Sequence, residues 1–199
     1  MIRNIIFDLG NVLLNFNPER FLSVRYDKDK GKRILREVFQ SEEWLMLDKG
    51  VITQEEAIEV LSRRFPMDSS TIEQVFQEWT EMLTPIYGTV EILEKLKEND
   101  YRLYVLSNFH ILAFNKVYRD YSFFQLFDGM IISSKVKKLK PELEIYYELI
   151  NRYSINPEES IFIDDIPENL KGAEKAGLRT ILFRSPEDLL SELRKYGII

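Results

Sequence analysis

The sequence predicts an α/β fold, a doubly wound parallel sheet with an all-helical subdomain inserted into it. Three observations over the 199 residues support this prediction. Short, almost wholly apolar runs recur along the chain, as expected of strands that are buried on both faces of a parallel sheet. Helical patterns separate the later runs, and strands that alternate with helices form right-handed crossover units. Between the first and second runs, only helical spacing occurs.

Five apolar runs are predicted to be the strands of the sheet. They are residues 2–7, 103–106, 130–132, 161–163 and 181–183. Helical spacing of apolar residues predicts helices over 82–97 and 142–151. Proline suits the first position of a helix because it lacks the amide hydrogen that would be unpaired there. Pro141 and Pro186 are therefore expected to begin the helices that follow them.

The insertion is predicted to span residues 15–85. Apolar residues in its second half follow helical spacing. They are Ala57, Val60, Leu61 and Phe65, then Ile72, Val75, Phe76, Trp79, Met82 and Leu83. The pairs Thr53–Glu56 and Ser70–Glu73 have the spacing of capping boxes, in which each side chain bonds the backbone of the other residue. These pairs are expected to begin the two helices.

Composition excludes several classes of protein. The formal net charge is −6, so a broad basic surface for nucleic acid or an anionic membrane is not expected. Cysteine is absent and His110 is the only histidine, which excludes disulfides, thiol nucleophiles and Cys/His zinc sites. No apolar run is long enough to span a membrane, and the N-terminus lacks the pattern of a signal peptide. We predict a cytoplasmic protein with a small-molecule partner.

Polar residues stand at or after the ends of four predicted strands. They are Asp8 after the first, Ser107 and Asn108 after the second, Lys140 after the third, and Asp164 and Asp165 at the fourth. In open parallel sheets, ligands bind outside the carboxyl ends of the strands. We therefore expect these side chains to converge in one crevice.

The chemistry of this set indicates a site for magnesium and phosphate. Asp8 and one or both of Asp164 and Asp165 offer hard anionic oxygens, which suit Mg²⁺. Three carboxylates at close range repel one another unless a cation neutralises them. Lys140 and the polar pair after the second strand offer donors for a phosphoryl group. A carboxylate can attack phosphorus once its charge is screened, and the aspartyl-phosphate that forms is then hydrolysed by water.

Four segments carry a resemblance to a known family. They are F-D-L-G-N-V-L at 7–13, L-S-N at 106–108, K-P at 140–141 and F-I-D-D at 162–165. In this order they resemble motifs one to four of the haloacid dehalogenase-like (HAD-like) hydrolases. The resemblance covers essentially the whole chain and implies a Rossmann-like core of residues 1–14 and 86–199, with a helical cap inserted after motif one. Within the superfamily, the chain looks most like bacterial sugar-phosphate phosphatases of the α-D-glucose-1-phosphate phosphatase type.

The resemblance implies a role for each polar residue. Asp8 would be the nucleophile. The phosphoryl group would be held by Ser107, Asn108 and Lys140, of which Lys140 is also catalytic. The cofactor would be Mg²⁺, and its ligands would be Asp8, the backbone carbonyl of Gly10, Asp165 directly, and Asp164 directly or through water. The substrate would be a small phosphorylated metabolite such as a hexose 1-phosphate.

One position departs from the family pattern. Most HAD phosphatases carry a second Asp two residues after the nucleophile as general acid and base, but here that position is Gly10. The neighbouring Asn11 cannot exchange protons near neutral pH. Acid–base help of this kind is worth about 10² to 10⁴-fold in rate. Either the enzyme is slow, or its leaving group is good, as in an anomeric phosphate, or another residue supplies the acid. Asp48, in a predicted polar loop between cap helices, is a candidate.

Other residues and functions stay open. His110 lies three residues after Ser107 and is expected to be its neighbour on one helical turn. Trp44 and Trp79 are expected to pack inside the cap. One alternative function is a haloacid dehalogenase, which lacks the second Asp and needs no metal. The other is a HAD-fold binding or regulatory protein with weak catalysis or none. The oligomeric state, monomer or homodimer, is not predicted.

Overall fold

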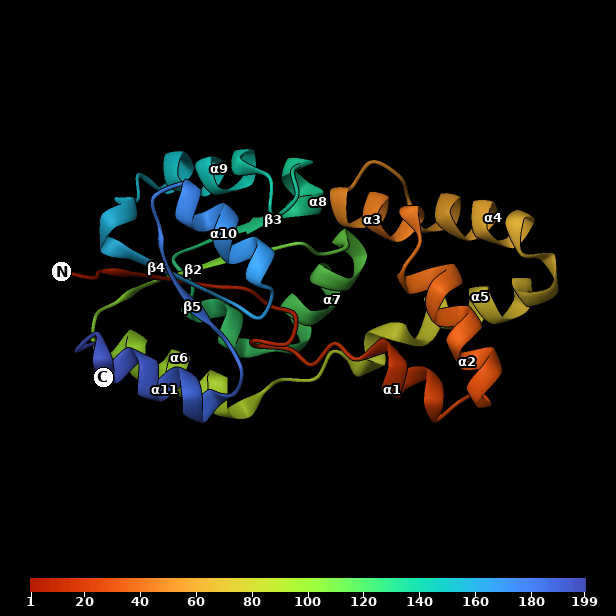
Figure 1. The fold of residues 1–199 in the computed structure, drawn as a ribbon, viewed down its shortest axis with the longest axis horizontal. Coiled ribbons are helices and arrows are strands. Elements are labelled where there is room, and N and C mark those ends of the chain that lie inside the picture. Colours follow the sequence, from red (N-terminus) through yellow and green to blue (C-terminus); the bar gives the residue numbers. More distant parts are fainter.

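The computed structural model describes all 199 residues and confirms the α/β class. Its sheet has five strands in the order β3-β2-β1-β4-β5, and every neighbouring pair is parallel. The strands are β1 (Asn4–Phe7), β2 (Arg102–Ser107), β3 (Gly129–Ile132), β4 (Ser160–Asp164) and β5 (Arg179–Leu182). All five predicted strands are therefore confirmed, and the first strand lies in the middle of the sheet (Figure 1).

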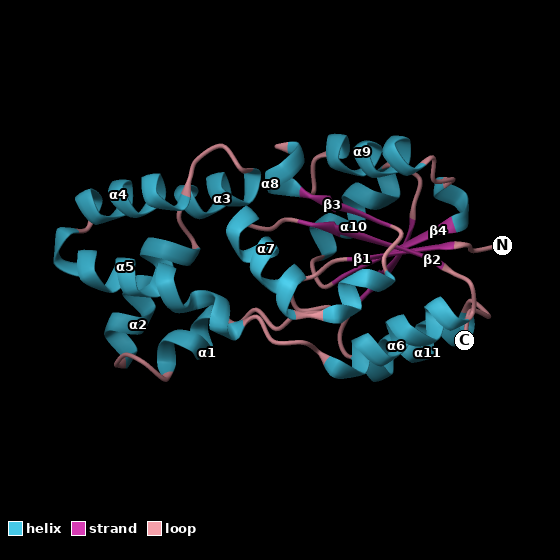
Figure 2. Ribbon diagram, turned by 180° about the vertical axis from the view of Figure 1, so that it is seen from behind, coloured by secondary structure: helices cyan, strands magenta, loops and turns pink.

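Helices cover both faces of the sheet, and the alternation of side chains along each strand divides the core in two. Ile5 and Phe7 of β1 belong to one buried cluster, whereas Ile6 between them belongs to the other. The core helices α6 (Tyr87–Glu98), α7 (Ile111–Asp120) and α11 (Pro186–Lys195) pack their side chains into the first cluster, which continues into the segment between β1 and β2. Two helices join the second: α9 (Leu143–Tyr153) and α10 (Pro167–Lys175). Figure 2 shows α6 and α11 together on one side of the sheet and α9 on the other.

Two predicted helix starts differ from the structure. Helix α6 begins at Tyr87 instead of residue 82, because the backbone before it pairs with the chain that leaves β1: Ile86 donates to the Leu13 carbonyl at 2.8 Å. Helix α9 begins at Leu143, with Glu142 as its N-cap. Pro141 is therefore not its first residue. Helix α11 begins as predicted, with Pro186 in its first turn.

The segment between β1 and β2 is entirely helical, as predicted (Figure 1). Its elements are α1 (Pro18–Ser23), α2 (Lys28–Ile34), η1 (Leu35–Phe39), α3 (Glu42–Lys49), α4 (Gln54–Arg64), η2 (Pro66–Asp68), α5 (Ser69–Glu78) and η3 (Trp79–Met82). This helical insertion lies beyond one end of the sheet. Residues 14–17 and 83–86 join it to the core.

One of the two predicted capping boxes is confirmed. The backbone N–H of Glu56 donates to Thr53 Oγ1 at 3.2 Å, and the Thr53 N–H donates back to the Glu56 carboxylate at 2.7 Å. The second prediction is wrong, because α5 begins at Ser69 directly after the short helix η2. Asp68 stands at the cap position without capping the helix, since its carboxylate is bound by Arg33 at 2.6 and 3.1 Å.

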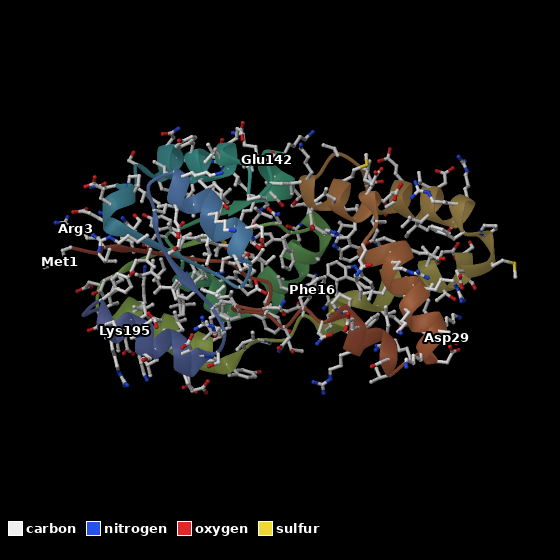
Figure 3. The ribbon with its side chains drawn as sticks, in the orientation of Figure 1. Met1, Arg3, Phe16, Asp29, Glu142 and Lys195 are labelled. Atoms are coloured by element: carbon white, nitrogen blue, oxygen red, sulfur yellow. The ribbon has the colours of Figure 1, made fainter.

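Aromatic side chains fill the insertion and its junction with the core. The rings of Trp44 and Trp79 are 4.9 Å apart, and both residues are buried, as predicted. Phe16, on the first linker, packs against both, and its ring centroid lies 6.2 Å from that of Trp44 and 6.3 Å from that of Trp79. Figure 3 shows Phe16 at the waist between the sheet and the insertion. The first linker is also bonded to the second, since Asn15 donates its N–H to the Thr84 carbonyl at 2.8 Å.

None of the helices combines the length and the apolar character needed to cross a membrane.

Candidate active site

Asp8 stands directly after the central strand. Its N–H donates to the Ile163 carbonyl of β4 at 2.9 Å, so the strand pairing continues up to this residue. The chain then turns sharply, because the Leu9 carbonyl accepts the N–H groups of both Leu13 and Leu14, at 2.9 and 2.8 Å. Asn11 in this turn has φ of 55°, a left-handed conformation that asparagine tolerates better than most residues. The turn leaves the Asp8 side chain buried, facing the ends of the neighbouring strands.

Lys140 joins Asp8 to Asp164. Its Nζ lies 2.8 Å from Oδ1 of Asp8 and 2.6 Å from Oδ2 of Asp164, and its side chain is 1% exposed. A buried ammonium group is tolerable only when carboxylates pair with it. Asn108 positions the lysine: its side-chain amide donates to the Lys140 carbonyl at 3.1 Å, and its Oδ1 accepts the Lys140 N–H at 2.9 Å. This pairing holds the Lys140 backbone outside helix α9.

Asp164 is fully buried and its two oxygens have several partners. Oδ1 accepts the Ile166 N–H at 2.8 Å, and the Asn169 side-chain amide lies 3.1 Å from both oxygens. The Asn169 backbone is held in turn, because the Tyr146 hydroxyl donates to its carbonyl at 2.7 Å. Asn169 is not among the site residues predicted from the sequence. The available signal was a polar residue on the inward face of a helix that begins just after the Asp164–Asp165 pair.

Three carboxylates lie close enough to share a metal ion. One oxygen each from Asp8, Asp164 and Asp165 fall within 4.8 Å of one another. All three are hard anionic donors, the ligand type that Mg²⁺ prefers. Asp165 is the least committed of them, since its carboxylate accepts a single side-chain hydrogen bond, from Asn11 at 3.2 Å. The residues present therefore fit a magnesium ion, with Asp165 as the most available ligand.

The electrostatics of the cluster point to a missing positive charge. Burial raises the pKa of Asp8 to about 7, although the attraction of Lys140 opposes it. Burial also raises the pKa of Asp165. Burial lowers the pKa of Lys140, but the nearby Asp8 and Asp164 carboxylates outweigh it, so this pKa lies above its usual value. One ammonium group thus faces three carboxylates, and a divalent cation would complete the balance.

Ser107 and Gly10 complete the set of predicted residues. Ser107 ends β2, and its buried hydroxyl hydrogen-bonds to Asp8, which lowers the pKa of that carboxyl. A Cβ added at Gly10 would meet no atom within 4 Å. Lack of space is therefore not the reason for glycine at this position. What the position lacks is an acidic side chain.

Asp48 stands in a helix near Asp8 and Lys140, and not in a flexible loop. It belongs to the last turn of α3, which ends at Lys49 with Gly50 as a left-handed cap, so the predicted polar loop is wrong. A helix C-terminus closed by glycine is a common end, and it keeps Asp48 in a fixed direction. Its side chain is 19% exposed. Both Asp8 and Lys140 are near enough to influence its ionisation.

The sequence spacing predicts that His110 shares a helical turn with Ser107, and this prediction is wrong. Ser107 ends β2, whereas His110 is the N-cap of α7 and has an extended backbone with φ of −61° and ψ of 139°. The imidazole is buried against the insertion, with ring centroids 4.3 Å from Trp44 and 5.1 Å from Trp79. Its Nε2 lies 3.3 Å from Oδ1 of Asp48.

Comparisons with known proteins agree with this fold. A crystal structure of a HAD family enzyme from Bacteroides thetaiotaomicron, in complex with magnesium and inorganic phosphate, is 28% identical, with a TM-score of 0.75, over 93% of this chain and 96% of that one. A sesquiterpene phosphatase of Aspergillus oryzae is 27% identical over 173 residues, 87% of this chain and 85% of that protein. A phosphorylated carbohydrates phosphatase of Thermotoga maritima is 24% identical over 178 residues, 89% and 82% of the two chains.

The family itself is identified by a sequence profile. The profile described as haloacid dehalogenase-like hydrolase matches residues 5–183, which include β1 and β4 with their carboxylates and the whole helical insertion. The chain therefore belongs to the haloacid dehalogenase-like hydrolases and is an enzyme of that family.

Proposed function

We propose that this chain is a magnesium-dependent phosphatase that acts on a small phosphorylated metabolite through an aspartyl-phosphate on Asp8. The observation that carries the proposal is the buried cluster in which Lys140 bridges Asp8 and Asp164, with Asp165 within metal-sharing distance. Phosphatase names and a magnesium–phosphate complex among the similar proteins support the same activity. The helical insertion, residues 15–85, serves as the cap over a core of 1–14 and 86–199.

The phosphoryl group binds between the strand ends. Lys140 supplies the positive charge that draws the phosphoryl oxygens toward Asp8 and lets two anions approach each other. Ser107 adds a hydroxyl donor beside the nucleophile. Asn108 bonds the Lys140 backbone with both the oxygen and the nitrogen of its amide. It therefore contributes to phosphoryl binding mainly by holding Lys140 in place.

Four groups would hold the magnesium ion. They are the carboxylates of Asp8, Asp165 and Asp164, and the backbone carbonyl of Gly10. Asp165 would be a direct ligand. Asp164 already accepts bonds from Lys140 and Asn169, and it would bind the ion directly or through water. Bound there, Mg²⁺ supplies charge neutralisation to the carboxylates and to the phosphoryl oxygens.

The reaction takes place in two steps at Asp8. In the first, a carboxylate oxygen of Asp8 forms a bond to phosphorus while the bond from phosphorus to the leaving oxygen breaks, and that oxygen takes up a proton. In the second, a water oxygen forms a bond to phosphorus, loses a proton, and the bond to Asp8 breaks. Inorganic phosphate and the free Asp8 carboxylate result. Lys140 stays protonated throughout and faces the same anions in both steps.

The substrate class we propose is a sugar phosphate, such as a hexose 1-phosphate. An anomeric phosphate is a better leaving group than an alkyl phosphate, which suits a site with glycine at position 10. The Thermotoga relative, a phosphatase of phosphorylated carbohydrates, supports this class. We also propose a cytoplasmic location. The partner we propose is a small phosphorylated molecule, and not a nucleic acid or a membrane.

A simple assay tests the proposal. Purified protein with p-nitrophenyl phosphate should release p-nitrophenol only when Mg²⁺ is present, and Asp8→Asn should abolish this release. Equal activity of the two proteins would refute the role of Asp8. A panel of sugar, nucleotide and amino-acid phosphates then ranks the substrates by kcat/KM.

The same assay separates the rival functions. Activity on 2-haloacids without metal would indicate a dehalogenase instead. Known structures of such an enzyme share the fold, but at 19% identity that likeness carries no functional weight. Inactivity of the wild-type protein across the whole phosphate panel would favour a binding or regulatory protein.

A further inference from the structure

The end of helix α3 is fixed against the core at one small contact. The Ser133 hydroxyl, at the start of α8 (Ser133–Val136), donates to the backbone carbonyl of Asp48 and accepts the Phe109 N–H at 2.9 Å. Gly50, with φ of +71°, lies so close to the Ser134 carbonyl that a Cβ there would overlap it. The insertion therefore touches the core at the backbone of Asp48, and this contact sets where its side chain points.

The side chain of Asp48 lies beside a histidine nitrogen that has no other partner. His110 Nε2 is buried, lies 3.3 Å from Oδ1 of Asp48 and makes no hydrogen bond elsewhere. The imidazole is 4% exposed and cannot swing away, because Trp44 and Trp79 enclose it. A buried polar atom that faces a single partner is costly to leave unpaired, so the position of His110 directs the Asp48 carboxyl.

We propose that Asp48, oriented by His110, is the general acid and base that glycine at position 10 fails to provide. The inference rests on the proposed phosphatase function and names a further catalytic residue for it. Asp48 comes from the insertion and lies within electrostatic reach of the Asp8 carboxylate, whereas the usual acid comes from the loop after β1. His110 is a positioning residue from the core.

The protonation of both groups suits this role. Burial raises the pKa of Asp48 to about 8; the Asp8 carboxylate adds to the effect and Lys140 opposes it. Burial lowers the pKa of His110 to about 3, against a smaller opposing effect from the Trp44 backbone. Asp8, Lys140 and His110 are the titratable groups that face Asp48. At neutral pH the pair consists of a protonated carboxyl and a neutral imidazole, so a proton is available at Asp48.

The proton balance closes over the two steps. As the bond from phosphorus to the leaving oxygen breaks, that oxygen takes the proton of the Asp48 carboxyl and leaves as an alcohol. Asp48 is then a carboxylate. When water attacks the aspartyl-phosphate, Asp48 accepts the proton that the water loses, and the resting state is restored.

A series of leaving groups tests Asp48 directly. We expect Asp48→Asn to lower kcat/KM for glycerol phosphate by about 10² to 10⁴-fold, because the alkoxide then departs without a proton. For p-nitrophenyl phosphate, whose leaving group needs no proton, the loss should stay under about tenfold. Glu42→Gln, an exposed carboxylate on the same helix, is the matched control and should change neither rate. Equal losses for both esters, or no loss for either, would overturn the assignment.

His110→Gln should show the same dependence on the leaving group in a weaker form, since the carboxyl remains but is less well directed. A purely structural role would lower both rates equally. Asp8→Asn removes activity on every ester, so failure of the phosphatase function is distinguishable from failure of the Asp48 assignment.

A thermal unfolding experiment tests the same carboxyl without any substrate. When folding raises the pKa of a carboxyl, the protein keeps its full stability at pH values below the unfolded pKa. The protein loses stability as the pH rises toward the folded pKa. The Tm of Asp48→Asn minus that of the wild type should therefore grow between pH 5 and about 8. A difference that does not change with pH would contradict a protonated Asp48.

Discussion

The strand-end cluster and the insertion contact are both buried and polar, but they are built in different ways. In the cluster of Asp8, Lys140 and Asp164, each charge is carried by the sheet or its connections, and each has a close partner of opposite sign. At the insertion contact, Asp48 arrives from a separate helical unit. The comparison indicates that the charges needed in every step are fixed by the core, whereas the proton donor is brought by the insertion.

The two regions also differ in how completely their polar atoms are satisfied. In the cluster, Asp164 accepts hydrogen bonds at both oxygens, and Oδ1 of Asp8, which accepts no hydrogen bond, lies 2.8 Å from the Lys140 ammonium group. Around the insertion contact, Nε1 of Trp79 and Oγ of Ser134 are buried without hydrogen-bond partners, and Nε2 of His110 has only the Asp48 carboxyl, at 3.3 Å. Each such atom costs about 1–3 kcal/mol. The contact is therefore held less firmly than the cluster, which suits a surface that must separate for substrate to reach the buried Asp8.

Removing Lys140 should have the largest effect on stability and activity of the changes considered for the two regions. In Lys140→Met, Asp8 and Asp164 would face each other without their shared cation, and breaking a buried ion pair in this way costs about 3–5 kcal/mol. Loss of the charge should also lower kcat by about 10²-fold or more. Denaturant unfolding measures the first effect. Added Mg²⁺ should recover part of the stability, because it replaces some of the missing positive charge.

Lys137→Met is the matched control for this variant. Lys137 belongs to the same basic run but is exposed and forms no ion pair, so its loss should leave both quantities unchanged. An unfolding free energy of Lys140→Met equal to that of the wild type would show that the cluster does not depend on its lysine.

Position 10 offers a way to move the proton donor from the insertion back to the core. Because a Cβ at Gly10 meets no atom within 4 Å, the backbone there leaves room for a side chain to begin. In an Asp48→Asn background, Gly10→Asp should restore at least about tenfold of kcat/KM for glycerol phosphate, while Gly10→Asn should restore none. If both replacements behaved alike, the deficit of the Asp48 variant would not be one of acid catalysis.

Most of the fold could be predicted because its signals are local. The five apolar runs and the alternation of helices identify a parallel sheet without tertiary information. The capping box at Thr53 and Glu56 succeeded for the same reason. The box at Ser70 failed because Asp68 and Arg33, distant in sequence, pair with each other and change where the helix starts. No local pattern contains that contact.

The site divides in the same way. Asp8, Lys140, Asp164 and Asp165 come together because the ends of parallel strands share one edge of a sheet, which follows from topology alone. The pairing of Asp48 with His110 depends on how the insertion docks on the core, through Ser133, Ser134 and two tryptophans. Sequence spacing even placed His110 on the wrong turn. Side-chain directions across such an interface require the three-dimensional structure.

The smallest expected effect tests whether the insertion can be weakened without touching the chemistry. Arg33 binds Asp68 with two nitrogens, at 2.6 and 3.1 Å, and through these bonds it lowers the pKa of Asp68. A lowered pKa contributes stability above the unfolded value, near pH 4, that is lost as pH falls through the folded value. Arg33→Met should therefore lower Tm by a constant amount above about pH 5 and by less in more acidic solution, with kcat unchanged.

Arg63→Met provides the comparison for this variant, since Arg63 and its partner Glu59 are mostly exposed, and exposed pairs contribute little. Thermal unfolding followed from pH 3 to 7 would measure both. A Tm deficit of Arg33→Met that widened in acid would have the wrong sign for this ion pair. A fall in kcat would mean that the folding of the insertion and the placement of Asp48 are coupled, because the pair joins α2 to η2 inside the insertion and has no contact with the strand-end cluster.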